Sequence, residues 1–147
     1  MSKPNNYMLF GLPGADLRAA SRRVEALFGF AMTLISSGAW GDYYVWDGPE
    51  GEEIRVYQNA MEDEDGKGFH EPDYAEFPLL VEVVDVADQD GYLTAILGDP
   101  EMKATRLLRE VYSKGPAGEV ICEIYSPNGE VTVERFLHGV RITDESD

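Results

Sequence analysis

Hydrophobic residues alternate with polar ones, or form short runs, over most of this chain, which is the spacing typical of β-strands. The pattern predicts strands over 7–12, 31–36, 42–46, 53–58, 78–86, 120–125 and 131–136. Gly, Pro and Asn gather between several of them, and the turn Ser126-Pro127-Asn128-Gly129 predicts a hairpin. Sheet is therefore expected to be the main component of the fold.

Two stretches have helical spacing instead. In 16–28, apolar residues recur every three or four positions, and Gly29 follows as a stop signal. A second helix is expected over 88–97, because three of its apolar residues share one helical face and Gly98-Asp99-Pro100 comes directly after them.

The segment 103–112 fits either structure. Its apolar residues satisfy a helical face as well as a strand. If it is a strand, the order βαβββ in 5–60 is repeated in 78–137, and if it is a helix the repeat is broken. We predict an α+β fold, with two helices on a mainly antiparallel sheet and, in the first alternative, two βαβββ modules.

The chain is strongly acidic, with 28 Asp and Glu against 12 Lys and Arg and a net charge of −16. This charge argues against a nucleic acid and favours a cationic partner. Residues 61–90 hold eleven of the acids and one Lys. We expect 61–77 to be an exposed acidic loop joining the two halves of a single domain, 1–147. It is either a solvated loop or a docking surface that includes Asp63, Glu64, Asp65 and Glu71.

Composition also bears on the compartment. No apolar run is long enough for a membrane span, and the first residues lack the apolar stretch of a secretory signal. The single cysteine, Cys122, has no partner for an intramolecular disulfide. These features predict a cytoplasmic protein that does not enter a membrane.

No catalytic or metal-binding pattern is found in the sequence. A calcium loop placed on the acidic segment would have Met61 and Pro72 where oxygen ligands are needed. His70 and His138 are far apart, and Cys122 alternates with apolar neighbours as a buried thiol would. We expect no cofactor, no metal and no catalytic residues, although enzymatic activity stays open.

Aromatic residues cluster in 40–46 and recur at Tyr57. Alternation along two predicted strands places them on one face, opposite an aliphatic face. This aromatic face is either core beneath a helix or a recognition surface, because rigid aromatics beside charged groups are favoured at protein interfaces. The candidate partner-binding aromatics are Trp40, Tyr44, Trp46 and Tyr57.

The repeated βαβββ order resembles the vicinal oxygen chelate fold, in which two modules form a cleft and His and Glu side chains bind a divalent metal. The matching strands of this chain offer Glu82 and Glu134, with no histidine beside either. The resemblance implies a metal-free small-molecule-binding protein or enzyme of that architecture.

The first eighty residues also resemble small acidic immunity proteins of bacterial polymorphic and contact-dependent toxin systems. This resemblance is carried by Gly11-Leu12-Pro13-Gly14, three arginines in the first predicted helix, Gly41-Asp42-Tyr43-Tyr44 and Tyr57-Gln58-Asn59. It implies a cytoplasmic inhibitor that neutralises a cationic toxin domain by direct binding, without catalysis of its own. Neither resemblance indicates an oligomeric state.

Overall fold

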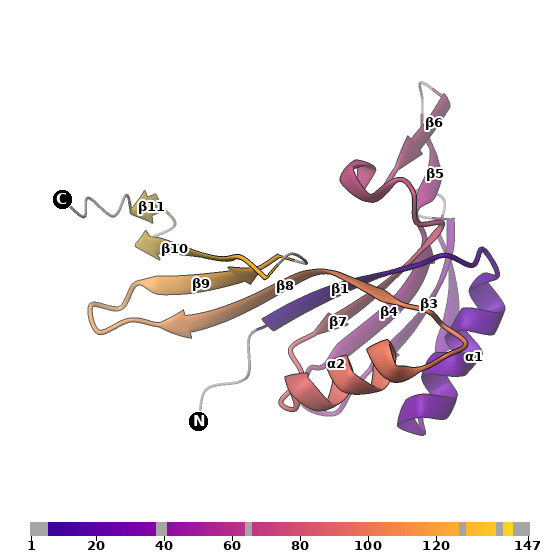
Figure 1. The fold of residues 1–147 in the computed structure, drawn as a ribbon, viewed down its shortest axis with the longest axis horizontal. Coiled ribbons are helices and arrows are strands. Elements are labelled where there is room, and N and C mark those ends of the chain that lie inside the picture. Colours follow the sequence, from indigo (N-terminus) through magenta and orange to yellow (C-terminus); the bar gives the residue numbers. More distant parts are fainter. Residues whose placement is uncertain (1–5, 38–40, 64–65, 127–128, 138–139, 143–147) are drawn as a thin grey trace.

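The computed structural model describes residues 6–37, 41–63, 66–126, 129–137 and 140–142, and it has an α+β architecture. Two helices pack on one face of a nine-stranded sheet, while a separate two-stranded hairpin projects away from them (Figure 1). Every strand pair of the sheet is antiparallel. The predicted fold class is therefore confirmed.

The elements have the following bounds. The sheet has the spatial order β11 (Val140–Ile142), β10 (Val131–Leu137), β9 (Val120–Tyr125), β8 (Thr105–Lys114), β1 (Asn6–Leu12), β7 (Leu79–Val84), β4 (Glu53–Gln58), β3 (Gly41–Asp47) and β2 (Thr33–Ser37). The helices are α1 (Leu17–Phe28) and α2 (Gln89–Gly98). The hairpin consists of β5 (Ala60–Asp63) and β6 (Gly66–Phe69), and a 3-10 turn, η1 (Pro72–Tyr74), follows it.

Both helices begin and end where the sequence predicts. The Asp16 carboxylate accepts a hydrogen bond from the Ala19 amide and caps α1, and Gly29 ends this helix with a left-handed φ of 76°. The Asp88 carboxylate caps α2 in the same way, by accepting from the Gly91 amide at 3.0 Å. Short polar side chains and one glycine thus define the helix ends.

The ambiguous segment 103–112 forms a strand, β8. Its ladder with β1 has an irregularity between Leu9 and Phe10, where the partner residue changes from Leu108 to Arg106. Because of this bulge, the adjacent Leu107 and Leu108 both pack into the same apolar cluster. Neighbouring apolar residues on one face imitate helical spacing, which explains why the pattern fits both structures.

The element order βαβββ occurs twice, as predicted: β1-α1-β2-β3-β4 and β7-α2-β8-β9-β10. The pairing does not repeat. In the sheet, β7 lies beside β4, the last strand of the first unit, whereas β1 lies beside β8, the strand that follows the helix of the second unit. The first strand of each unit therefore pairs with strands of the other unit, and the two halves have different strand orders.

The core has two parts on opposite faces of the sheet. The larger one lies beneath the helices and includes Met8, Phe10, Val24, Val81 and Ile96, all of which are fully buried. The smaller one, on the face without helices, contains Leu9, Tyr57, Leu80 and Leu107. Both faces of the central strands are thus apolar, and the second face is where the acidic segment lies.

The acidic segment is more regular than the loop predicted for 61–77. The β5–β6 hairpin takes up its first part and η1 its middle, so these residues have regular secondary structure where the sequence predicts an exposed loop. Hydrophobic alternation is missing from Glu62 to Phe69, and the two short strands pair through their backbones. A hairpin of this kind leaves no signal in the hydrophobic pattern.

The close packing of β1 against the segment that precedes β7 is testable at Gly11. A methyl group at Gly11 would overlap the Phe77 ring, which packs in the smaller core cluster. We expect Gly11→Ala to lower the free energy of unfolding by about 1–3 kcal/mol, as overpacked sites do. Urea unfolding measures this loss.

The matched control is the double variant Gly11→Ala/Phe77→Leu. Its smaller side chain makes room for the methyl group, so the two substitutions should cost less together than the sum of their separate effects. Equal stability of Gly11→Ala and the wild type would contradict the packing described here.

Candidate functional site

The structure describes half of the predicted partner-binding residues in full. Trp40, Glu64 and Asp65 lie outside the described residues, and Asp63 is described only as a backbone position in β5. The side chains that can be placed are those of Tyr44, Trp46, Tyr57 and Glu71.

Tyr44 and Trp46 belong to the helix-covered face. Both are partly buried against the larger core cluster. The Trp46 ring stacks on Phe30 with centroids 4.1 Å apart and planes 5° apart, and Phe28 continues the row to Tyr92 of α2. For these two residues, the interpretation as core beneath a helix is confirmed.

Tyr57 lies on the opposite face. In the β3–β4 ladder it pairs with Tyr43, whereas Tyr44 pairs with Val56 and Trp46 with Ile54. The prediction of one shared aromatic face is therefore wrong: alternation within each strand was correct, but the register between the strands was not known. A register shift of one residue reverses the face of every side chain.

Tyr57 forms the centre of a polar cluster on the helix-free face. Its side chain is 1% exposed, and its hydroxyl donates a 2.8 Å hydrogen bond to Oε1 of Glu82. Burial, followed by the Glu82 charge, raises the pKa of both Tyr57 and Tyr7 above the ordinary tyrosine value. Both phenols are thus neutral hydrogen-bond donors at physiological pH, next to a carboxylate in the middle of an apolar strand.

Glu71 reaches this cluster because a buried asparagine holds the segment around it. The Asn59 side chain is completely buried; its Nδ2 donates to the carbonyls of Tyr74 (2.9 Å) and Glu71 (3.3 Å), and its Oδ1 accepts from the Glu71 amide (2.9 Å). The Asn59 carbonyl also accepts from the His70 amide at 2.8 Å. The side chain and the backbone carbonyl of Asn59 together therefore hold the backbone from 70 to 74 over the sheet.

The carboxylates of this segment affect one another. Partial burial raises the pKa of Glu71, and the nearby charges of Glu82 and Asp73 raise it further, while His70 offsets a smaller part of this rise. Burial also raises the pKa of Tyr74, as do Asp73, Glu71 and Glu76. Among the described residues, no Lys or Arg lies within 4 Å of the Glu71, Asp73 or Glu76 carboxylates. We call Glu71, Asp73, Tyr74 and Glu76 the acidic patch.

The negative charge of this arrangement would attract a cation. Within the described ranges no three His, Cys, Asp or Glu side chains come together as metal ligands, so the metal-free expectation stays a prediction. Sequence reasoning treated Glu82 only as a metal ligand and missed Tyr7 and Asn59. The signals were a lone acid inside a run of aliphatic residues and an amide directly after a strand.

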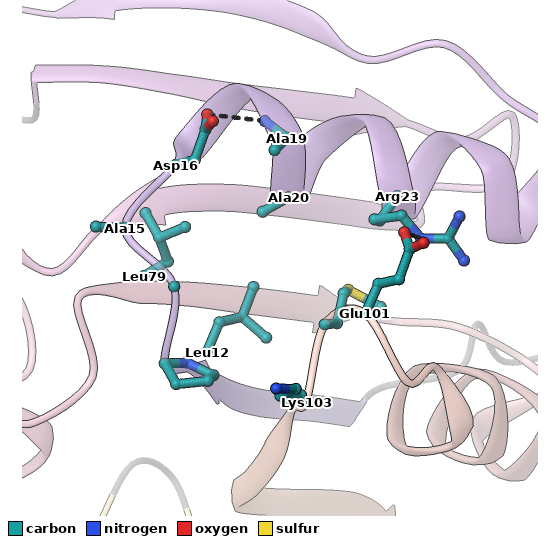
Figure 2. Close-up of a pocket in the computed structure, with 12 residues that line it drawn as sticks. Leu12, Ala15, Asp16, Ala19, Ala20, Arg23, Leu79, Glu101 and Lys103 are labelled. Carbon is teal, nitrogen blue, oxygen red and sulfur yellow. Dashed lines mark hydrogen bonds and ion pairs between the residues drawn. The ribbon is translucent and has the colours of Figure 1, made fainter.

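A second feature is a pocket on the other side of the molecule, with a volume of about 470 Å³ (Figure 2). It lies between the first turns of α1, the end of β1 and the segment that connects α2 to β8. Its apolar lining includes Leu12, Ala19, Ala20, Leu79 and Met102, and its charged lining residues are Asp16, Arg23, Glu101 and Lys103.

An ion pair fixes the connection beside this pocket. Arg23 of α1 binds Asp99 through two hydrogen bonds, Nη2 to Oδ1 at 2.6 Å and Nε to Oδ2 at 3.2 Å, and its Nε lies 3.1 Å from Glu101. Asp99 Oδ2 also accepts from the Met102 amide at 3.2 Å, and these bonds lower the pKa of the Asp99 carboxyl. Arg23 is therefore held between the Asp99 and Glu101 carboxylates.

Comparison with known proteins gives no relative from which a function could be transferred. No protein-family model matches the chain, and no curated protein is significantly similar to it. Within the described part of the chain, neither helix has the length and apolar character needed to cross a membrane.

The role of Asn59 in holding the acidic patch is testable. Asn59→Ala removes three side-chain hydrogen bonds and leaves backbone groups of Glu71 and Tyr74 without these partners. We expect a loss of about 2–3 kcal/mol in the free energy of unfolding. We also expect faster hydrogen exchange at the Glu71 amide, measured by NMR.

The control is Gln58→Ala, because Gln58 is an exposed neighbour of Asn59. Gln58→Ala should leave the Glu71 amide protected. Unchanged protection of that amide in Asn59→Ala would show that the buried amide does not hold this segment.

Proposed function

We propose that this chain is an immunity-type protein, which neutralises a cationic toxin domain by binding it directly and has no catalytic role. The observation that carries the proposal is the acidic patch, in which carboxylates lie close together and no Lys or Arg of the described residues lies within 4 Å of them, while the nearby His70 offsets only part of the charge effect on Glu71. The sequence resemblance to immunity proteins supports the same function.

The acidic patch is unfavourable for the folded protein taken alone. Like charges that raise the pKa of Glu71 repel each other, and a free loop would separate them. Here the buried Asn59 holds the segment in place despite this repulsion. A cationic partner would reverse the sign of the interaction, so strain stored in the free protein becomes affinity in the complex.

The β5–β6 hairpin extends the proposed binding surface beyond the acidic patch. The β5–β6 hairpin lies close to η1 and projects beyond the sheet (Figure 1). Asp63 is a backbone position of β5, and the sequence-based candidates Glu64 and Asp65 lie outside the described residues, so these three carboxylates stay in the proposal from the sequence alone. Tyr74, partly buried at the centre of the patch, supplies an aromatic contact. The proposed surface does not include Trp46, because its ring stacks on Phe30.

Charge and aromatic contacts should act on different steps of binding. With a net charge of −16, the chain attracts a basic protein over distance and raises the association rate. A partly buried tyrosine mainly slows dissociation. A toxin that acts on nucleic acid needs a basic surface itself, and an acidic protein competes for that surface.

A second candidate function is a metal-free small-molecule-binding protein. The pocket in Figure 2 favours it, since its volume and mainly apolar lining are typical of ligand sites.

The primary proposal is tested by expressing the chain with the product of the adjacent gene. We expect protection of cells from a toxic neighbour and a complex of the two purified proteins. Glu71→Lys/Asp73→Lys should lower the association rate by about tenfold or more and weaken its dependence on salt, because it reverses the charge of the acidic patch.

The control Asp47→Lys/Glu50→Lys makes the same change of net charge in exposed residues at the opposite end of β4. It should have a clearly smaller effect on association. Equal effects of the two variants would mean that only total charge matters, and a lack of protection and binding with every neighbouring toxin would overturn the proposal.

A further inference from the structure

We infer that the pocket between α1 and the α2–β8 connection binds a small amphiphilic anion, with an apolar body and one negatively charged head group that pairs with Lys103. This inference is independent of the proposed toxin binding, because it concerns the helix-covered side of the molecule and not the acidic patch.

The walls of the pocket suit an apolar body. Leu12 ends β1, Leu79 begins β7 and Met102 lies in the α2–β8 connection, and all three are buried. Ala19 and Ala20 present the small side chains of α1 to the same space, which leaves room between the helix and the strand ends (Figure 2). A volume of about 470 Å³ lies within the usual range for small-molecule sites.

Three of the four charged residues that line the pocket already have partners. The Asp16 carboxylate accepts from the Ala19 amide and caps α1, where the helix dipole also compensates its charge. Arg23 is shared by the Asp99 and Glu101 carboxylates, so its charge is already compensated. The fourth residue is therefore the lining cation that can still pair with a ligand.

That residue is Lys103, and it is available for a ligand. Its side chain is exposed, and no carboxylate of the described residues lies within 4 Å of its ammonium group. An ammonium group in this position selects a carboxylate or phosphate head group.

The backbone at Lys103 supports this reading. Its φ is 51°, a left-handed conformation that is unfavourable for a lysine and is usually taken by Gly or Asn. The preceding Met102 is held by the Asp99 carboxylate, so the connection turns here and brings Lys103 to the pocket while Met102 forms its wall. Strained residues of this kind occur preferentially where a side chain must have a particular position.

The test uses octanoate as the probe and two-dimensional amide NMR as the readout. We expect saturable shifts confined to Gly14, Ala15, Ala19 and Lys103, all of which line the pocket. Octyl phosphate should shift the same amides. Comparing its dissociation constant with that of octanoate shows whether a carboxylate or a phosphate head group binds more tightly. Octanol should bind about tenfold or more weakly, because it lacks the charge.

Two pairs of variants separate the pocket from the rest of the surface. Ala19→Phe fills the pocket from an exposed helical position and should abolish octanoate binding, whereas Ala26→Phe, at another exposed position of α1, should not. Lys103→Gln should weaken octanoate about tenfold and leave octanol unchanged, and Lys114→Gln, at the exposed end of β8, should change neither.

Several results would overturn the inference. These are the absence of saturable shifts, shifts located outside the pocket, equal binding of octanol and octanoate, or octanoate binding that persists in Ala19→Phe. Thermal unfolding of each variant confirms that the fold is retained, so a loss of binding reports on the pocket itself.

Discussion

The structure depends on two buried asparagines, Asn59 and Asn6, whose hydrogen bonds hold the two ends of the neighbouring strand β7. At the start of β7, the backbone amide of Asn59 donates to the Pro78 carbonyl at 2.9 Å, and the Asn59 side chain binds the backbone of Glu71 and Tyr74. At its end, the Asn6 side chain donates to the Val86 carbonyl at 2.8 Å and accepts from the Val86 amide at 3.2 Å. Because an unpaired buried amide is costly, only one register of β1, β7 and β4 satisfies both asparagines.

The two faces of the sheet acquire different characters from this register. Met8, Val81 and Val83 lie beneath the helices, where α1, β1 and the α2–β8 connection leave the apolar pocket. Glu82 lies on the other face beside Tyr57, and the segment held by Asn59 adds further carboxylates. The same arrangement of strands therefore supports both proposals, an acidic surface on one side and a ligand site on the other.

Local signals made much of the fold predictable. Asp16 and Gly29 define α1 without reference to the rest of the chain, and most strands follow from alternation. The strand β8 was ambiguous because a bulge places Leu107 and Leu108 on one face. The predicted aromatic surface was wrong because Tyr57 pairs with Tyr43 and so lies on the face opposite Tyr44 and Trp46. Alternation within each strand does not reveal the register between two strands that are joined by a five-residue turn.

The central claim is that the fold holds the carboxylates of the acidic patch close together, and the titration of Glu71 measures this most directly. Burial, Glu82 and Asp73 place the pKa of Glu71 above its ordinary value. A folded pKa above the unfolded one means that the Glu71 charge destabilises the fold at neutral pH, and that this effect disappears as the pH falls through the folded pKa. Carbon-detected NMR of the Glu71 carboxyl should give a raised pKa that decreases in Asp73→Asn. An ordinary pKa that is unaffected by Asp73→Asn would contradict the account.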